Sequence, residues 1–183
     1  ELKYHEFSVK TGIANIPTAV LGQYGTSGPV IAFLGEYDAL AGLSQKADQF
    51  RQVPIEKGGN GHGCGHNLLG SASMQAAVAL KNWLQESNLP GIVRYYGCPA
   101  EEGGAAKTFM VRDKVFEDVD AAITWHPGCL PGIVKGSSLA NCRVDFTFEG
   151  KASHAAVSPH LGRSALDAIE LMNVGVNYMR EHM

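Results

Sequence analysis

The sequence has 183 residues, of which 45% are hydrophobic and 18% are charged, with 22 glycines and a formal net charge of -3. This composition is typical of a loop-rich globular chain about one domain in length, and it excludes disordered, coiled-coil and collagen-like proteins. The small negative charge gives no indication of binding to nucleic acid or anionic lipid. No apolar run is long enough to span a membrane.

The first part of the chain alternates predicted strands with predicted helices. Apolar runs at residues 30–34, 92–96 and 120–125 predict buried strands, and apolar residues at helical spacing predict helices over 67–85 and 105–115. We therefore expect an α/β fold with a mainly parallel sheet and helices on both faces. Ligand sites in such sheets lie beyond the carboxyl ends of the strands, which is where Asp38, Glu101, Glu102 and His126 occur.

The pattern changes after Gly136. Residues 141–148 alternate polar and apolar side chains, which predicts a half-exposed strand, and residues 163–179 carry apolar residues at helical spacing. One strand and one helix cannot close a domain, so we place a boundary between residues 1–135 and 136–183 and expect an incomplete chain. The absence of a signal peptide and of paired cysteine spacing favours free thiols and a cytoplasmic setting.

The glycine-rich stretch GHGCGHN (residues 61–67) is the most informative motif. Flanking glycines let the backbone bend tightly, so that the thiolate of Cys64 and the imidazole of His66 can face one metal ion. Two ligands are too few, and the strand ends offer a carboxylate and His126 as additional ones. Nucleophilic catalysis by Cys64 with His66 as base is the alternative, but residues two apart in such a turn seldom reach the required geometry.

Two adjacent carboxylates, Glu101 and Glu102, follow the strand at 92–96 in a segment that proline and glycine predict to be a loop. One can bind the metal while the other takes a proton from the attacking water and returns it to the leaving amine. Because a bound metal lowers the pKa of water, the combination predicts amide hydrolysis. An isolated pair of glutamates is more often a solvated surface feature, so the prediction depends on the whole set.

Five motifs together resemble, in content and order, those of the M20 family of metallopeptidases, and within it the amidohydrolase branch that includes p-aminobenzoyl-glutamate hydrolases. They are GEYDAL (35–40), GHGCGHN (61–67), PAEEGG (99–104), WHP (125–127) and GKASHA (150–155). The resemblance implies that residues 1–135 are the N-terminal part of a metal-dependent catalytic domain. Residues 136–183 would begin an α+β lid or dimerisation domain.

The resemblance also implies roles for individual residues. It assigns Cys64, His66, Glu102 and His126 as metal ligands, Glu101 as the general base, Asp38 as a residue that orients a metal-site group, and His154 as a lid residue that contacts substrate in a neighbouring subunit. The implied cofactor is zinc or manganese, with two ions in the full-length enzyme, and the implied assembly is a homodimer or heterodimer through the lid. Suitable substrates are N-acyl amino acids such as aminobenzoyl-glutamate, or dipeptides.

One departure from the family pattern limits these implications. The family supplies a further metal-binding histidine from a C-terminal catalytic segment that this sequence lacks. We therefore expect the chain alone to be inactive and to hold metal weakly. A noncatalytic binding or assembly module is the alternative function.

Overall fold

The computed structural model describes residues 1–133 and 136–182. The chain divides into two compact units, Glu1–Gly132 and Ile133–Met183. Residues 134 and 135, on which the expected domain boundary falls, lie outside the described residues. The assignment of the two parts to a catalytic and a lid domain stays a prediction.

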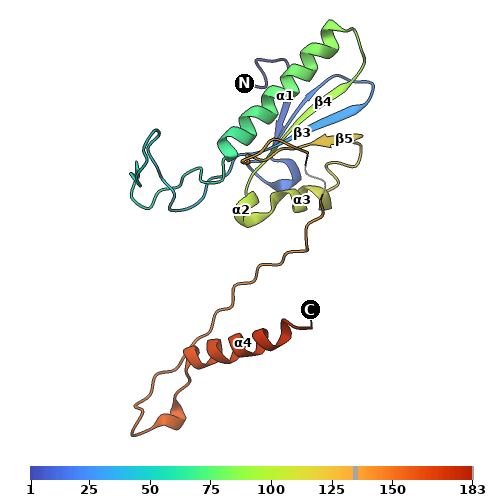
Figure 1. Cartoon of the computed structure of the whole chain (residues 1–183). Coiled ribbons are helices and arrows are strands. Elements are labelled where there is room, and N and C mark those ends of the chain that lie inside the picture. Colours follow the sequence, from blue (N-terminus) through green and yellow to red (C-terminus); the bar gives the residue numbers. More distant parts are fainter. Residues whose placement is uncertain (134–135, 183) are drawn as a thin grey trace. The chain divides into compact units, whose positions relative to one another are not determined.

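A five-stranded mixed sheet forms the first unit, in the order β1-β2-β4-β3-β5 (Figure 1). Its strands are β1 (Ser8–Thr11), β2 (Val20–Tyr24), β3 (Val30–Glu36), β4 (Ile92–Cys98) and β5 (Ala121–Ile123). The predicted strands β3, β4 and β5 pair in parallel, whereas β2 is antiparallel to both β4 and β1. The α/β fold is confirmed. Strands β1 and β2 are antiparallel because a short connection, here the one through the 3₁₀ turn η1 (Ile13–Asn15), can join only antiparallel neighbours.

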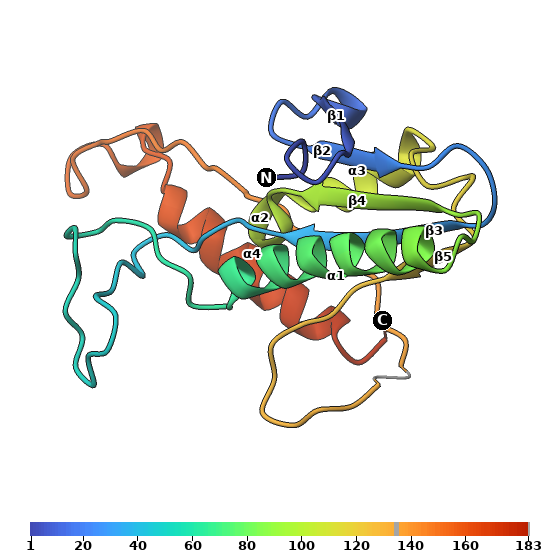
Figure 2. The ribbon, with the colours of Figure 1, turned by 90° about the horizontal axis from the view of Figure 1, so that it is seen from above.

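Helices cover both faces of the sheet, as expected. Helix α1 (His66–Glu86) lies along one face, and α3 (Ala106–Arg112) lies on the other (Figure 2). Alternate strand residues supply the two cores, because successive side chains of a strand point to opposite faces. Phe33 and Tyr95 pack with the α1 core, while Ala32 and Tyr96 pack with the core that contains Met110 of α3.

Two local expectations were wrong. The segment Glu101–Gly104, expected to be a loop, forms the short helix α2, which the left-handed residues Ala100 and Ala105 bound on either side. The predicted strand at residues 141–148 is absent, since no strand among the described residues pairs with it. A polar-apolar alternation favours a strand only where a neighbouring strand can complete its hydrogen bonds.

The second unit contains the 3₁₀ turn η2 (Pro159–Leu161) and helix α4 (Ala165–Met179), close to the helix predicted over 163–179. Ser164 caps α4 by accepting a hydrogen bond from the Asp167 amide. Many apolar side chains of α4 are exposed within the unit, including Leu166 and Tyr178. Among the described residues, no helix combines the length and apolar character needed to cross a membrane.

Candidate metal centre

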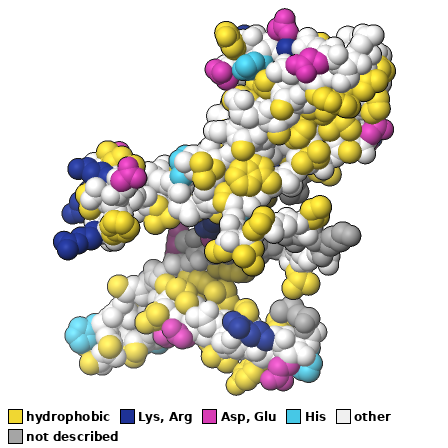
Figure 3. Space-filling model, turned by 45° about the horizontal axis from the view of Figure 1, so that its top comes forward, with side chains coloured by type: hydrophobic (Ala, Val, Ile, Leu, Met, Phe, Trp, Pro, Cys, Tyr) yellow, Lys and Arg dark blue, Asp and Glu magenta, His cyan; other side chains and the backbone are white. Residues whose placement is uncertain are grey.

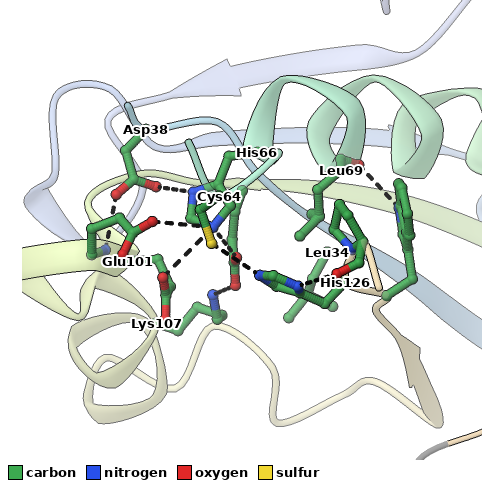
Figure 4. A network of polar contacts seen from close by, with 12 residues as sticks. Leu34, Asp38, Cys64, His66, Leu69, Glu101, Lys107 and His126 are labelled. Carbon is green, nitrogen blue, oxygen red and sulfur yellow. Dashed lines mark hydrogen bonds and ion pairs between the residues drawn. The ribbon is translucent and has the colours of Figure 1, made fainter. Parts of the chain in front are cut away.

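Polar side chains from four separate segments meet at the carboxyl end of the parallel strands (Figure 4). Glu36 ends β3 and Asp38 follows it, Cys64 and His66 stand at the start of α1, Glu101 and Glu102 begin α2, and His126 follows β5. The sequence predicted this location because carboxyl ends of parallel strands share one edge of the sheet. Of the predicted site residues, only His154 belongs to the second unit.

The loop between β3 and α1 delivers Cys64 and His66 to this edge. An antiparallel bridge between Leu40 and Gly61 closes the base of the loop. Lys and Arg side chains gather at its outer end (Figure 3), and the sequence of the loop contains Lys46 and Arg51. The outer end of the loop is therefore positively charged, whereas the site at its base is rich in carboxylates.

Close packing of α1 against β3 fixes the position of His66. Gly65 has a φ of 86°, and a Cβ there would lie 2.8 Å from Cγ of Pro127. One turn into the helix, a Cβ on Gly70 would lie 2.7 Å from the carbonyl oxygen of Glu36. Both positions need glycine, one for its backbone conformation and the other for close approach. The Ser73 hydroxyl also donates to the Leu34 carbonyl at 2.9 Å, so the start of α1 is held at the strand end.

His66 is fully buried and has one nitrogen without a hydrogen-bond partner. Its Nδ1 lies 3.0 Å from Oδ1 of Asp38, and a carboxylate can only accept, so Nδ1 donates. The neutral ring then carries its lone pair on Nε2, which has no hydrogen-bond partner in the described residues. A buried nitrogen without a partner needs an explanation, and a role in binding a cation is one.

Three carboxylates surround this unpartnered nitrogen. Oxygens of Glu36, Glu101 and Glu102 lie 3.1, 3.7 and 3.8 Å from Nε2 of His66. Their side chains are 10%, 42% and 25% exposed, so Glu101 is the most open to solvent. A lone pair facing several carboxylate oxygens is electrostatically unfavourable by itself, and a divalent cation between them would reverse the sign of the interaction.

Cys64 and His126 form a second pair of donors beside His66. The Cys64 Sγ lies 3.3 Å from Nε2 of His126. The other ring nitrogen of His126 faces the Pro127 carbonyl oxygen at 3.0 Å, so Nδ1 donates and Nε2 is free to bind a metal. Ligand atoms of Cys64, His66 and His126 all lie within 4.8 Å of one another. Burial and the neighbouring Glu102, Glu101 and Glu36 carboxylates raise the pKa of the Cys64 thiol, an effect that a nearby cation would oppose.

Asp38 holds two parts of the site together. Besides His66, it accepts a hydrogen bond from the Glu102 backbone amide to Oδ2 at 2.9 Å. Burial alone would raise the pKa of Asp38, but these hydrogen bonds outweigh it and hold the pKa below its ordinary value. Asp38 therefore stays ionised and fixes the ring of His66 relative to the start of α2.

The residues predicted as ligands thus lie together, and their donor atoms fit a divalent metal: a thiolate, two imidazoles with free nitrogens, and carboxylates. Sequence reasoning missed Glu36 and Lys107, which form an ion pair beside His66. The sequence offered one signal for each residue: Glu36 is a charged residue at the end of an otherwise apolar strand, and Lys107 is a lysine within a predicted helix.

His154 lies in the second unit. Its Nδ1 accepts a hydrogen bond from the Ala156 amide at 3.3 Å, which leaves Nε2 as the protonated nitrogen in the neutral ring.

Comparisons with known proteins identify relatives of this chain. Residues 32–182 match the profile of peptidase family M20/M25/M40. The chain is 55% identical to one of the subunits of the Escherichia coli p-aminobenzoyl-glutamate hydrolase, over 97% of this chain and 37% of that protein. It is 32% identical to a mouse Xaa-Arg dipeptidase, over 92% and 37% of the two chains. It is also 33% identical to the other subunit of the E. coli hydrolase, over 86% and 38%.

A solved structure supports the fold. The Bacillus subtilis YXEP protein, described as a dinuclear metal-binding peptidase, superposes with a TM-score of 0.53 at 24% identity. The match covers 66% of this chain and 33% of that one. The chain spans just over a third of the length of the curated relatives it matches.

Proposed function

The chain belongs to peptidase family M20/M25/M40, and from this premise we propose that it supplies the metal-binding residues of an amidohydrolase. The proposed reaction is hydrolysis of the amide bond of an N-acyl amino acid such as aminobenzoyl-glutamate, or of a dipeptide. The names of the E. coli and mouse relatives support these two substrate classes. The observation that carries the proposal is the buried, unpartnered Nε2 of His66 among carboxylates, next to the Cys64–His126 pair.

Four residues hold the metal in this proposal: Cys64, His66, Glu102 and His126. A bound divalent cation would polarise the amide carbonyl and lower the pKa of water so that hydroxide forms near neutral pH. Zinc suits the thiolate, and manganese suits carboxylate and imidazole, so either ion matches the donor set. We propose two ions in the complete site, in line with the dinuclear centre described for the B. subtilis protein.

Glu101 acts as the general base. Its carboxylate lies 3.7 Å from Nε2 of His66 and is the most exposed of the surrounding carboxylates, so it can reach both the cluster and an incoming substrate. Glu101 takes a proton from the attacking water and delivers it to the nitrogen of the leaving amine. Adjacent residues of a helix point about 100° apart, which lets Glu102 bind while Glu101 exchanges protons.

His154 supplies a hydrogen-bond donor to the substrate carbonyl oxygen. Support comes from its local hydrogen bond, which leaves the Nε2 proton available. The proposed assembly is a dimer in which this histidine serves the site of the neighbouring protomer. Similarity to both named subunits of the E. coli hydrolase supports a heteromeric complex, with a homodimer as the other arrangement.

Metal binding can be tested by thiol protection. Zn²⁺ or Mn²⁺ should slow alkylation of Cys64, read by mass spectrometry, while the exposed Cys129 and Cys142 in the same molecule serve as controls. Equal reactivity of Cys64 with and without either metal would contradict its role as a ligand.

Catalysis is tested in the full-length protein. Glu101→Gln should abolish amide hydrolysis and leave the metal content unchanged, whereas Glu56→Gln in the exposed loop should change neither. Undiminished turnover in Glu101→Gln would remove the general-base assignment. Metal binding without turnover of any tested amide by the wild type would instead favour the binding module.

A further inference from the structure

Glu36 is a buried carboxylate at the metal cluster to which the sequence motifs assign no role. It is the last residue of β3, and its side chain is only 10% exposed. One oxygen, Oε1, pairs with Nζ of Lys107 on α3, and the other, Oε2, lies 3.1 Å from Nε2 of His66. A buried charge needs compensation, and Lys107 compensates only the outer oxygen.

The inner oxygen of Glu36 faces the metal-binding side of His66. Asp38 already accepts the hydrogen bond from Nδ1 of His66, so Glu36 is not the acceptor that orients the ring through that nitrogen. Nor do Glu36 Oε2 and His66 Nε2 form a hydrogen bond, although they are only 3.1 Å apart. Two donor atoms that each lie about 2.0–2.2 Å from one ion, at the angle of about 90° in octahedral coordination, are separated by about 3 Å, which matches this spacing.

Charge balance points in the same direction. Glu36, Asp38, Glu101 and Glu102 bring four carboxylates to the cluster, and Lys107 is the cation that pairs with one of them. Ligand atoms of Glu36, His66 and Glu101 lie within 4.8 Å of one another. The group is oxygen-rich, in contrast to the neighbouring sulfur and nitrogen donors of Cys64 and His126.

We propose that Glu36 is an oxygen ligand of the cation bound at His66, and that Lys107 holds the second oxygen so that Glu36 binds through one oxygen alone. This inference rests on the proposed metal dependence. With Glu36 as a ligand, the two metal positions differ in the chemical type of their donor atoms. The position at Glu36 and His66 prefers a harder ion such as Mn²⁺, and the position at Cys64 and His126 prefers Zn²⁺.

The test is metal binding rather than turnover. In the full-length protein, Mn²⁺ affinity is measured by chelator competition, and Co²⁺ is used as a spectroscopic probe of each position. Glu36→Gln should weaken Mn²⁺ binding at least tenfold and change the visible Co²⁺ bands, while the thiolate-to-Co²⁺ charge-transfer band from Cys64 persists. Lys107→Met should weaken Mn²⁺ binding, Lys107→Arg should restore much of it, and Lys57→Met on the exposed loop should match the wild type.

Folding defects are separated by a second variant. Glu36→Asp keeps the charge opposite Lys107 but withdraws the oxygen from His66, so it should fold, as judged by circular dichroism, and still bind Mn²⁺ weakly. Wild-type affinity and Co²⁺ bands in a folded Glu36→Gln or Glu36→Asp variant would overturn the assignment while the proposed function stands. Failure of the wild type to bind any of these ions would overturn both.

Discussion

Replacing Asp38 by Asn tests whether the metal site depends on the tautomer of His66. Asp38 accepts from His66 Nδ1 at 3.0 Å and from the Glu102 amide at 2.9 Å. An asparagine oxygen can keep the bond to Glu102, but its NH₂ group would then face His66 and could donate only to an unprotonated Nδ1. The proton would move to Nε2, the atom that faces the carboxylates and is proposed to bind the cation.

The expected effect is on metal affinity more than on stability. Disturbing a residue that orients a metal-binding histidine costs about 10–100-fold in affinity, which corresponds to about 1.4–2.7 kcal/mol. Because the amide keeps one hydrogen bond and can form another, the unfolding free energy should fall by only about 1 kcal/mol. Asp38→Ala, which leaves the Nδ1 proton of the buried ring without an acceptor, should cost about 1–3 kcal/mol more.

Chelator competition with Zn²⁺ and Mn²⁺ on the full-length protein measures the affinity, and urea denaturation without metal measures the stability. Asp48→Asn, in the exposed part of the loop before α1, provides a matched control. If Asp38→Asn bound metal as tightly as the wild type, the tautomer would not govern the site. If its affinity loss merely followed its loss of stability, Asp38 would have a structural role alone.

Three further outcomes follow from the geometry. Gly65→Ala should lower the unfolding free energy by about 2 kcal/mol, measured by urea denaturation, because a Cβ at positive φ would also meet Pro127; an unchanged midpoint would contradict this packing. Cys98, whose pKa burial raises to about 12, should resist alkylation in the native protein and react only on unfolding, whereas the exposed Cys129 reacts at once. Asp38 has a lowered pKa in the folded state, so its stabilisation is present above its ordinary pKa of 3.8 and is lost as the pH falls through the lower folded value. The stability difference between wild type and Asp38→Ala should therefore shrink below about pH 4, and a constant difference would contradict the assignment.

The parts of the fold set by local pattern were predictable. The apolar run at 30–34 became the core of β3, and the Ala-rich pattern at 67–85 became α1 within one residue at either end. The antiparallel strands β1 and β2 were not predicted, since β2 joins the sheet through the distant strand β4 and β1 joins it only through β2. For the same reason the polar-apolar alternation at 141–148 was misleading. It indicates that a strand there would have one apolar face, but not that a neighbouring strand is available to pair with it.

The site was predicted through residue types and strand ends, and its omissions have a physical cause. Cys64 and His66 stand in a glycine-rich motif, which marks them in the sequence. Glu36 instead looks like the polar end of a buried strand, and only its distances to His66 and Lys107 reveal its importance. Such proximity arises from packing of α1 and α3 on opposite faces of the sheet, which no local pattern encodes.

The dispersal of the donor atoms along the chain couples ion binding to folding. His66 and His126 are 60 positions apart and approach each other only when β3 and β5 are paired and α1 is docked. An unfolded chain therefore has no preformed site, and an ion bound as proposed would stabilise the native state by mass action. Under the proposed metal dependence, the free metal concentration would therefore set the apparent stability of the fold, independently of the rate of any reaction at the site.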